Sequence, residues 1–177
     1  MSTAAEAAPR AGIVELFIRM NPPWVFIDEI RRFVESFCSC ASIGADREAQ
    51  VALAVHELMQ NAVPHANGHE VELDLELDPV AGHIVVRVTN ACGDEEYAAL
   101  VARIEQMYRE PDALRSYLRT MKEHPTTARG GLGLARVRFE AQMDIQVRRS
   151  ASDRVTVEAE GPIRAPSLST IAGGSHV

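Results

Sequence analysis

Apolar and polar residues follow two different periods along this chain, and these periods predict where helices and strands form. Apolar residues recur at helical spacing over residues 24–42 and 46–62, which predicts two consecutive amphipathic helices. They alternate with acidic residues over 70–78, and an apolar, β-branched run follows over 83–90 after a Pro and Gly turn. This pattern predicts a hairpin with one buried face and one acidic, solvated face. A first strand is predicted over residues 13–18.

The second half of the chain shows the same two periods. Helical patterns cover residues 95–108 and 112–121 and are separated by Pro111, and a third helix is predicted from about 132 to 143. Strands are predicted over 144–149 and 154–159. The order is then strand, two helices, hairpin, helical insert, helix, hairpin. Strands in antiparallel pairs with helices between them favour an α+β two-layer sandwich over a doubly wound parallel fold.

Composition limits the classes of protein to consider. The 177 residues suit one domain, which we place at 12–160, with an arm at 1–11 and a flexible tail at 161–177. A net charge of -7 argues against nucleic-acid or membrane-surface partners, which attract clustered cations. The sequence has no apolar run of membrane-spanning length and no secretory leader pattern, so we expect a cytoplasmic protein. Three cysteines without CxxC spacing indicate neither a disulfide framework nor a zinc site.

Two short motifs carry candidate chemistry. Glu57 and Asn61 lie four residues apart on the flank of the second predicted helix, so a carboxylate and an amide can converge on one site. About seventy residues later, the glycine turn at 129–134 runs into an apolar helix and can present backbone N–H groups to a phosphate. Together they predict a nucleotide site. The alternatives are a solvated helix position for Glu57, a helix cap for His65 and a plain turn for the glycines.

These motifs resemble those of a known family. Residues 57–65, ELMQNAVPH, resemble the N box of the GHKL ATPases, and residues 130–134, GGLGL, resemble their second glycine box. With the opening helix and the short length, residues 12–160 are most similar to the anti-sigma-factor serine/threonine kinases. The resemblance implies a Bergerat-type sandwich, with a mixed, mainly antiparallel sheet, helices on one face and a lid over residues 94–129.

The resemblance also implies ATP and Mg2+ as cofactors, with roles for individual residues. Asn61 would coordinate Mg2+, Glu57 would act as general base, and His65 would lie near the phosphates. The second glycine box would cradle the triphosphate through its backbone. Its residues are Gly130, Gly131, Leu132 and Gly133.

The chain departs from the family pattern in both glycine boxes. Asn90 stands where the family has an Asp that accepts the adenine amino group, and an amide oxygen can still accept one such hydrogen bond. Cys92 replaces a glycine, and Gly93, also expected to bind nucleotide, is out of register. Arg129 replaces the first glycine of the second box and could reach a γ-phosphate.

Two functions follow from the resemblance. The first is an ATP- and Mg2+-binding serine/threonine kinase of bacterial partner switching. It would phosphorylate or sequester a small partner that resembles an anti-sigma-factor antagonist or a sigma factor. The second, favoured by the altered first glycine box, is a non-catalytic binding module that acts through protein–protein contacts. A homodimer is compatible with both.

Overall fold

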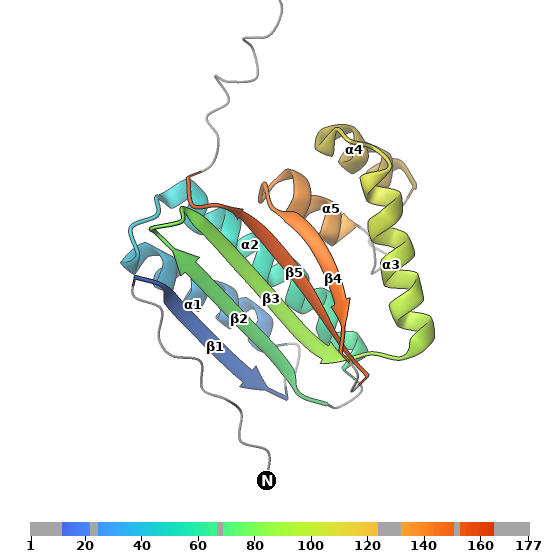
Figure 1. Cartoon of the computed structure of the whole chain (residues 1–177), viewed down its shortest axis with the longest axis horizontal. Coiled ribbons are helices and arrows are strands. Elements are labelled where there is room, and N and C mark those ends of the chain that lie inside the picture. The colour runs from blue at the N-terminus through green and yellow to red at the C-terminus, as the bar shows by residue number, and fades with distance from the viewer. Residues whose placement is uncertain (1–11, 22–24, 67–68, 124–131, 151–152, 165–177) are drawn as a thin grey trace, which may run out of the picture.

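The computed structural model describes residues 12–21, 25–66, 69–123, 132–150 and 153–164. Figure 1 shows the elements in chain order. They are β1 (Val14–Met20), α1 (Phe26–Cys40), α2 (Ala45–Ala62), the short 3-10 helix η1 (Val63–His65), β2 (Val71–Asp78), β3 (His83–Ala91), α3 (Asp94–Tyr108), α4 (Ala113–Glu123), α5 (Leu132–Phe139), β4 (Asp144–Arg149) and β5 (Arg154–Pro162).

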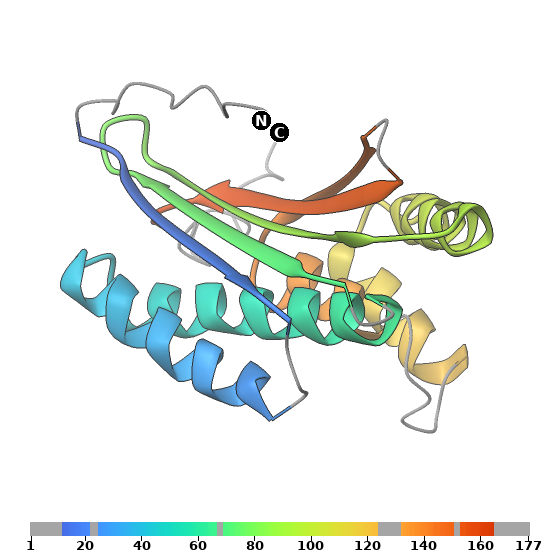
Figure 2. The same ribbon diagram turned by 90° about the horizontal axis from the view of Figure 1, so that it is seen from below.

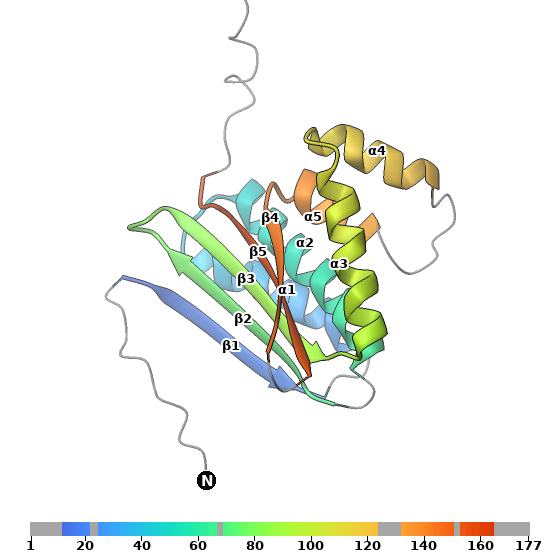
Figure 3. The same cartoon turned by 45° about the vertical axis from the view of Figure 1, so that its right-hand side comes forward.

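The five strands form one sheet in the order β1-β2-β3-β5-β4, and all four strand pairings are antiparallel. Helices α1 and α2 lie under one face of this sheet, as Figure 2 shows. Helices α3 and α4 extend from the side of the molecule that carries β4 and β5, which is clearest in Figure 3. The α+β two-layer sandwich predicted from the sequence is therefore confirmed.

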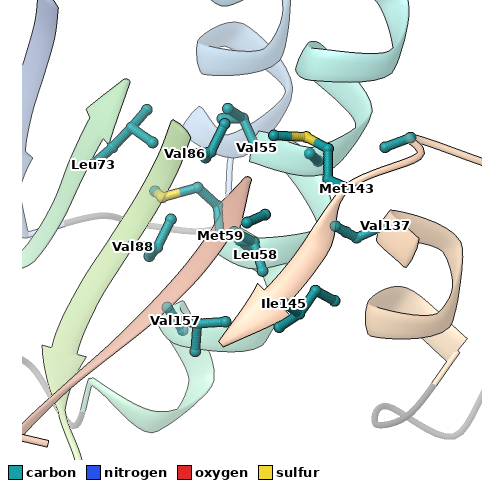
Figure 4. Close-up of a cluster of buried hydrophobic side chains, with 14 of the residues drawn as sticks. Val55, Leu58, Met59, Leu73, Val86, Val88, Val137, Met143, Ile145 and Val157 are labelled. Atoms are coloured by element: carbon teal, nitrogen blue, oxygen red, sulfur yellow. The ribbon is translucent and has the colours of Figure 1, made fainter. Parts of the chain in front are cut away.

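The core lies between the sheet and helix α2. On β2, every second residue from Val71 to Leu77 is fully buried, which confirms the predicted alternation. Val55, Leu58 and Met59 of α2 pack against Val86 and Val88 of the sheet (Figure 4). This packing fixes the rotation of α2 about its axis, and so fixes where Glu57 and Asn61 lie.

The opposite face of the sheet is acidic near β2. Arg87 of β3 forms ion pairs there with Glu158 at 2.7 Å, Glu76 at 3.3 Å and Asp74 at 3.6 Å. Burial lowers the pKa of Arg87, but the hydrogen bonds that Arg87 donates to Glu158 and Glu76, together with the nearby charge of Asp74, raise it above its ordinary value on balance. The single guanidinium of Arg87 therefore neutralises part of the negative charge of this cluster of carboxylates.

Two element ends differ from the sequence prediction. Helix α5 ends at Phe139 rather than near Met143, because the chain turns at Gln142, where φ is +51°. Strand β5 continues to Pro162, beyond the predicted Ala159, because its pairing with β3 extends to His83. None of the described helices is long and apolar enough to cross a membrane.

Candidate nucleotide-binding site

Asn61 and Asn90 line the same cavity, although they come from different layers of the fold. Asn61 lies in the last turn of α2, and Asn90 lies near the end of β3. The cavity has a volume of about 140 Å3 and includes residues of α3 and β5. Its lining residues are Asn61, His65, Asn90, Cys92, Glu96, Ala99, Leu100, Arg103, Val155 and Val157.

The side chain of Asn90 is oriented by its own backbone. It is only 3% exposed, and its Nδ2 donates a hydrogen bond of 2.7 Å to the carbonyl of Ala91. That bond engages one N–H of the amide and turns Oδ1 to the role of acceptor, and within the described part of the chain no hydrogen bond to Oδ1 is found. The apolar side chains of Val155, Val157 and Leu100 line the same cavity. An acceptor beside apolar walls suits a flat heterocycle with an exocyclic amino group.

His65 contacts α3 at the cavity. Its Nδ1 lies 3.1 Å from Oε1 of Glu96, and Oε2 of Glu96 accepts a hydrogen bond from the backbone N–H of Gly93. The hydrogen bond with His65, followed by that from Gly93, lowers the pKa of Glu96 below its ordinary value. Glu96 thus caps α3 and places a carboxylate in the cavity lining, two roles that the sequence analysis did not assign to it.

Glu57 is not among the residues that line this cavity. Its carboxylate is buried and forms an ion pair with Arg136 of α5. A Cβ on Gly133 would lie 2.7 Å from Oε2 of Glu57. The missing side chain at Gly133 therefore allows the first turn of α5 to approach Glu57, and the sequence pattern did not indicate this contact.

Arg136 also binds Glu140 through two hydrogen bonds, of 3.0 and 3.1 Å. These bonds are the main reason that the pKa of the Glu140 carboxyl lies below its usual value. Sequence analysis missed Arg136. An arginine in an apolar helix carries no signal by itself, and its partner Glu57 is 79 residues away in the chain.

Gly93 lies at a neighbouring depression. It begins α3 as the N-cap residue and lines a shallow volume of about 290 Å3 with His69, Cys92 and Arg149. The guanidinium of Arg149 is held by Asp94 at 2.5 Å and Asp153 at 3.2 Å. Cys92 belongs to both volumes, so the two are adjacent.

The second glycine box is described only in part. Arg129, Gly130 and Gly131 lie outside the described residues, whereas Leu132 and Gly133 form the first turn of α5. Among the residues that the structure describes, no group of three or more His, Cys, Asp or Glu side chains could hold a metal ion. A cation near Asn61 would need most of its ligands from a bound molecule or from water.

Comparisons with known proteins identify a similar fold. One chain of the solved SiaB–SiaC complex from Pseudomonas aeruginosa has a similar fold, with a TM-score of 0.64 and 18% sequence identity. The match covers 85% of this chain and 90% of that chain. A search of curated protein sequences finds no match.

A family model settles the classification. The model of the histidine kinase-like ATPase domain matches residues 26–158, from the start of α1 into β5. This range contains Glu57, Asn61 and Asn90, as well as the helices and strands that place them. Because the match spans well over half of the sequence, the chain belongs to the histidine kinase-like ATPase domain family.

Proposed function

We propose that this chain binds ATP with Mg2+ between α2, β3 and α3, and that it regulates a protein partner as a serine/threonine kinase of partner-switching type. The observation that carries the proposal is the convergence of Asn61 and Asn90 on one cavity. The family match supports nucleotide binding as the use of that cavity.

The cavity residues fit the base of the nucleotide. Oδ1 of Asn90 is the acceptor that an adenine amino group requires, because the amide nitrogen is already engaged with Ala91. The volume of about 140 Å3 lies below the range of roughly 300–1,000 Å3 typical of whole ligand pockets. It would hold the base end, and the phosphates would extend past Asn61 towards α5.

Asn61 fits a role as a magnesium ligand. An amide oxygen is a hard, neutral ligand, and Mg2+ in nucleotide sites takes most of its other ligands from phosphates and water. When bound, the ion would neutralise phosphate charge during phosphoryl transfer. His65 lies in η1, directly after the last turn of α2, and lines the cavity together with Asn61, which supports its assignment to the Asn61 end, near the phosphates.

Glu57 is the candidate general base, and its position sets a condition on that role. The carboxylate is held by Arg136, so it must leave this partner before it can accept a proton from a hydroxyl group at the cavity. The same ion pair favours the second candidate function, a binding module of this fold that does not transfer phosphate.

The exposed side of α4 supports a protein partner. Leu114, Leu118 and Met121 form an exposed apolar stripe at helical spacing. Arg115 and Lys122 are exposed on one flank of this stripe, on a chain whose net charge is -7. An acidic partner protein with an apolar patch would match this surface. The similar solved structure is itself a complex of two proteins, SiaB and SiaC.

Calorimetric titration of the whole chain with Mg-ATP tests the proposal. We expect saturable heat, and we expect Asn61→Ala to weaken binding by roughly tenfold or more. Gln60→Ala changes an exposed neighbour on the same helix and should bind as the wild type does. Absence of heat at millimolar nucleotide from a folded protein would contradict the proposal.

Glu57→Gln separates the two candidate functions. A kinase should keep nucleotide binding and lose phosphoryl transfer to its partner, because the glutamine side chain cannot accept the proton. A binding module should show no transfer in the wild type, and its retention of the partner should be unchanged by the substitution.

A further inference from the structure

Asn90 occupies a position that the alternation of β3 assigns to the core. Ile84, Val86 and Val88 are core residues at every second position of this strand, and Figure 4 shows Val86 and Val88 in the buried cluster. Asn90 is the next member of this series and is buried like the others. Burying an amide beside apolar side chains costs free energy unless its polar atoms are hydrogen-bonded. The hydrogen bonds of Asn90 therefore indicate what this position is used for.

The chain itself uses only part of the hydrogen-bonding capacity of this amide. A primary amide carries two N–H groups and an oxygen that accepts hydrogen bonds. Nδ2 of Asn90 donates to the carbonyl of Ala91 at 2.7 Å, and the side chain makes no other hydrogen bond with the residues that the structure describes. One N–H and Oδ1 therefore remain for a molecule in the cavity that Asn90 lines.

The carbonyl of Ala91 fixes which way round the amide lies. If the amide were turned over, Oδ1 would face this carbonyl, and two acceptors would repel each other. The amide therefore differs from a carboxylate of the same shape in a defined way. A carboxylate offers two acceptors to a ligand, whereas this amide offers one acceptor and one donor.

The other lining residues leave the edge of a bound base to Asn90. Ala99, Leu100 and the two valines of β5 are apolar, so they can pack against a flat ring but form no hydrogen bonds with its edge. His65 and Glu96 are engaged with each other at 3.1 Å. Asn90 is thus the residue best placed to distinguish one base from another.

We propose that Asn90 allows this site to bind 6-oxopurine nucleotides, those of hypoxanthine and guanine, as well as ATP. The inference rests on the proposed nucleotide site. In this arrangement Ala91 accepts the N–H on the Cβ side of the amide, and the other N–H faces the base beside Oδ1. Adenine then donates from its amino group to Oδ1 and accepts at a ring nitrogen.

A 6-oxopurine fits the same pair of groups after a small shift of the ring in its own plane. Its N1–H donates to Oδ1 of Asn90, and its O6 accepts from the free N–H of Nδ2. A carboxylate at this position would repel O6, because it has no donor to offer. The donor of the amide is therefore the feature that extends the site beyond adenine.

Calorimetric titration of the whole chain with Mg-ATP, Mg-ITP and Mg-GTP tests the proposal. We expect ITP and GTP to bind within roughly fivefold of ATP, because each base forms two hydrogen bonds with the amide. Asn90→Asp keeps the shape of the side chain and removes its donor. It should weaken ITP relative to ATP by roughly tenfold or more. Because this ratio is measured within one protein, a partial loss of folded protein affects both nucleotides alike.

Glu96→Gln is the matched control, since it changes the charge of the same cavity from α3. It should change the affinities for ATP and ITP by the same factor, because the two nucleotides share the triphosphate. Heat with ATP but none with ITP or GTP would overturn this inference and leave the proposed function standing, whereas no heat with any of the three would overturn both. An ATP-to-ITP ratio that Asn90→Asp does not change would overturn the role of Asn90.

Discussion

Arg136 determines the environment of Glu57, the residue expected to act as the base. Glu57 is only 7% exposed, and Arg136 is the one cation paired with it in the described structure. A buried carboxylate without a paired cation destabilises the folded state, because no electrostatic attraction offsets the loss of its hydration. The ion pair therefore links the packing of α5 to the role of Glu57, on α2, as the expected general base.

The first prediction concerns this pair. Arg136→Met keeps the length of the side chain but removes its charge and its donors. We expect it to lower the free energy of unfolding by roughly 2 kcal/mol. This is less than the ~3–5 kcal/mol of a fully buried pair, since Arg136 is partly exposed. Urea denaturation followed by circular dichroism measures the change.

Arg148→Met is the matched control. Arg148 binds Glu158, whose side chain is as buried as that of Glu57, but Glu158 also keeps Arg87 at 2.7 Å. Arg148→Met should therefore lower the free energy of unfolding by less than about 0.5 kcal/mol. Adding Glu57→Gln to Arg136→Met should recover part of the lost stability, because no buried charge then remains. Equal losses in Arg136→Met and Arg148→Met would contradict the account.

At this scale, local sequence indicated some site residues and not others. Asn61 could be identified because its motif is short and lies within one helix. Asn90 could be identified only through the family resemblance. Arg136 and Glu96 could not be found, because each acquires its role from a residue on another element. A residue pattern carries no direct information about such long-range contacts.

At the scale of elements, α3 forms one wall of the cavity and brings a negative charge to it. Glu96 and Arg103 lie two turns apart on this helix, and both line the cavity. Hydrogen bonds from His65 and Gly93 hold Glu96 in place. The position of α3 therefore affects both the shape of the site and its charge.

The second prediction follows from that charge. Glu96→Gln keeps an acceptor for Gly93 but removes a carboxylate that would repel ATP phosphates. We expect it to tighten Mg-ATP binding by roughly fivefold, as measured by calorimetry. Glu95→Gln removes the same charge from an exposed position one residue earlier and should have a smaller effect. Weaker binding in Glu96→Gln would show that the carboxylate helps to hold the nucleotide.

The elements were predicted more completely than the site. The periods of β2 and of α3 and α4 indicated their type, and Pro111 marked the break between the two helices. Local periodicity also placed the two hairpins. It could not indicate that β5 lies between β3 and β4, because that order depends on pairing between distant segments.

At the scale of the whole molecule, the candidate site lies on the side of the sheet that carries β5, away from the edge strand β1. Residues of β5 line the cavity with α2 and α3, whereas β1 pairs only with β2 among the strands that the structure describes. Phe17 is an exposed residue of β1 and does not line the cavity, so we expect Phe17→Asp to leave the Mg-ATP affinity unchanged, as measured by calorimetry. A loss of affinity in that variant would show that the two sides are coupled.

The central claim is that Asn61 and Asn90 bind one nucleotide together. A crystal structure of the chain with Mg2+ and a non-hydrolysable ATP analogue tests it most directly. The account predicts the base in the cavity, with its amino group donating to Oδ1 of Asn90, and a magnesium ion at the side-chain oxygen of Asn61. A nucleotide bound elsewhere, or an empty cavity in crystals grown at millimolar nucleotide, would contradict it.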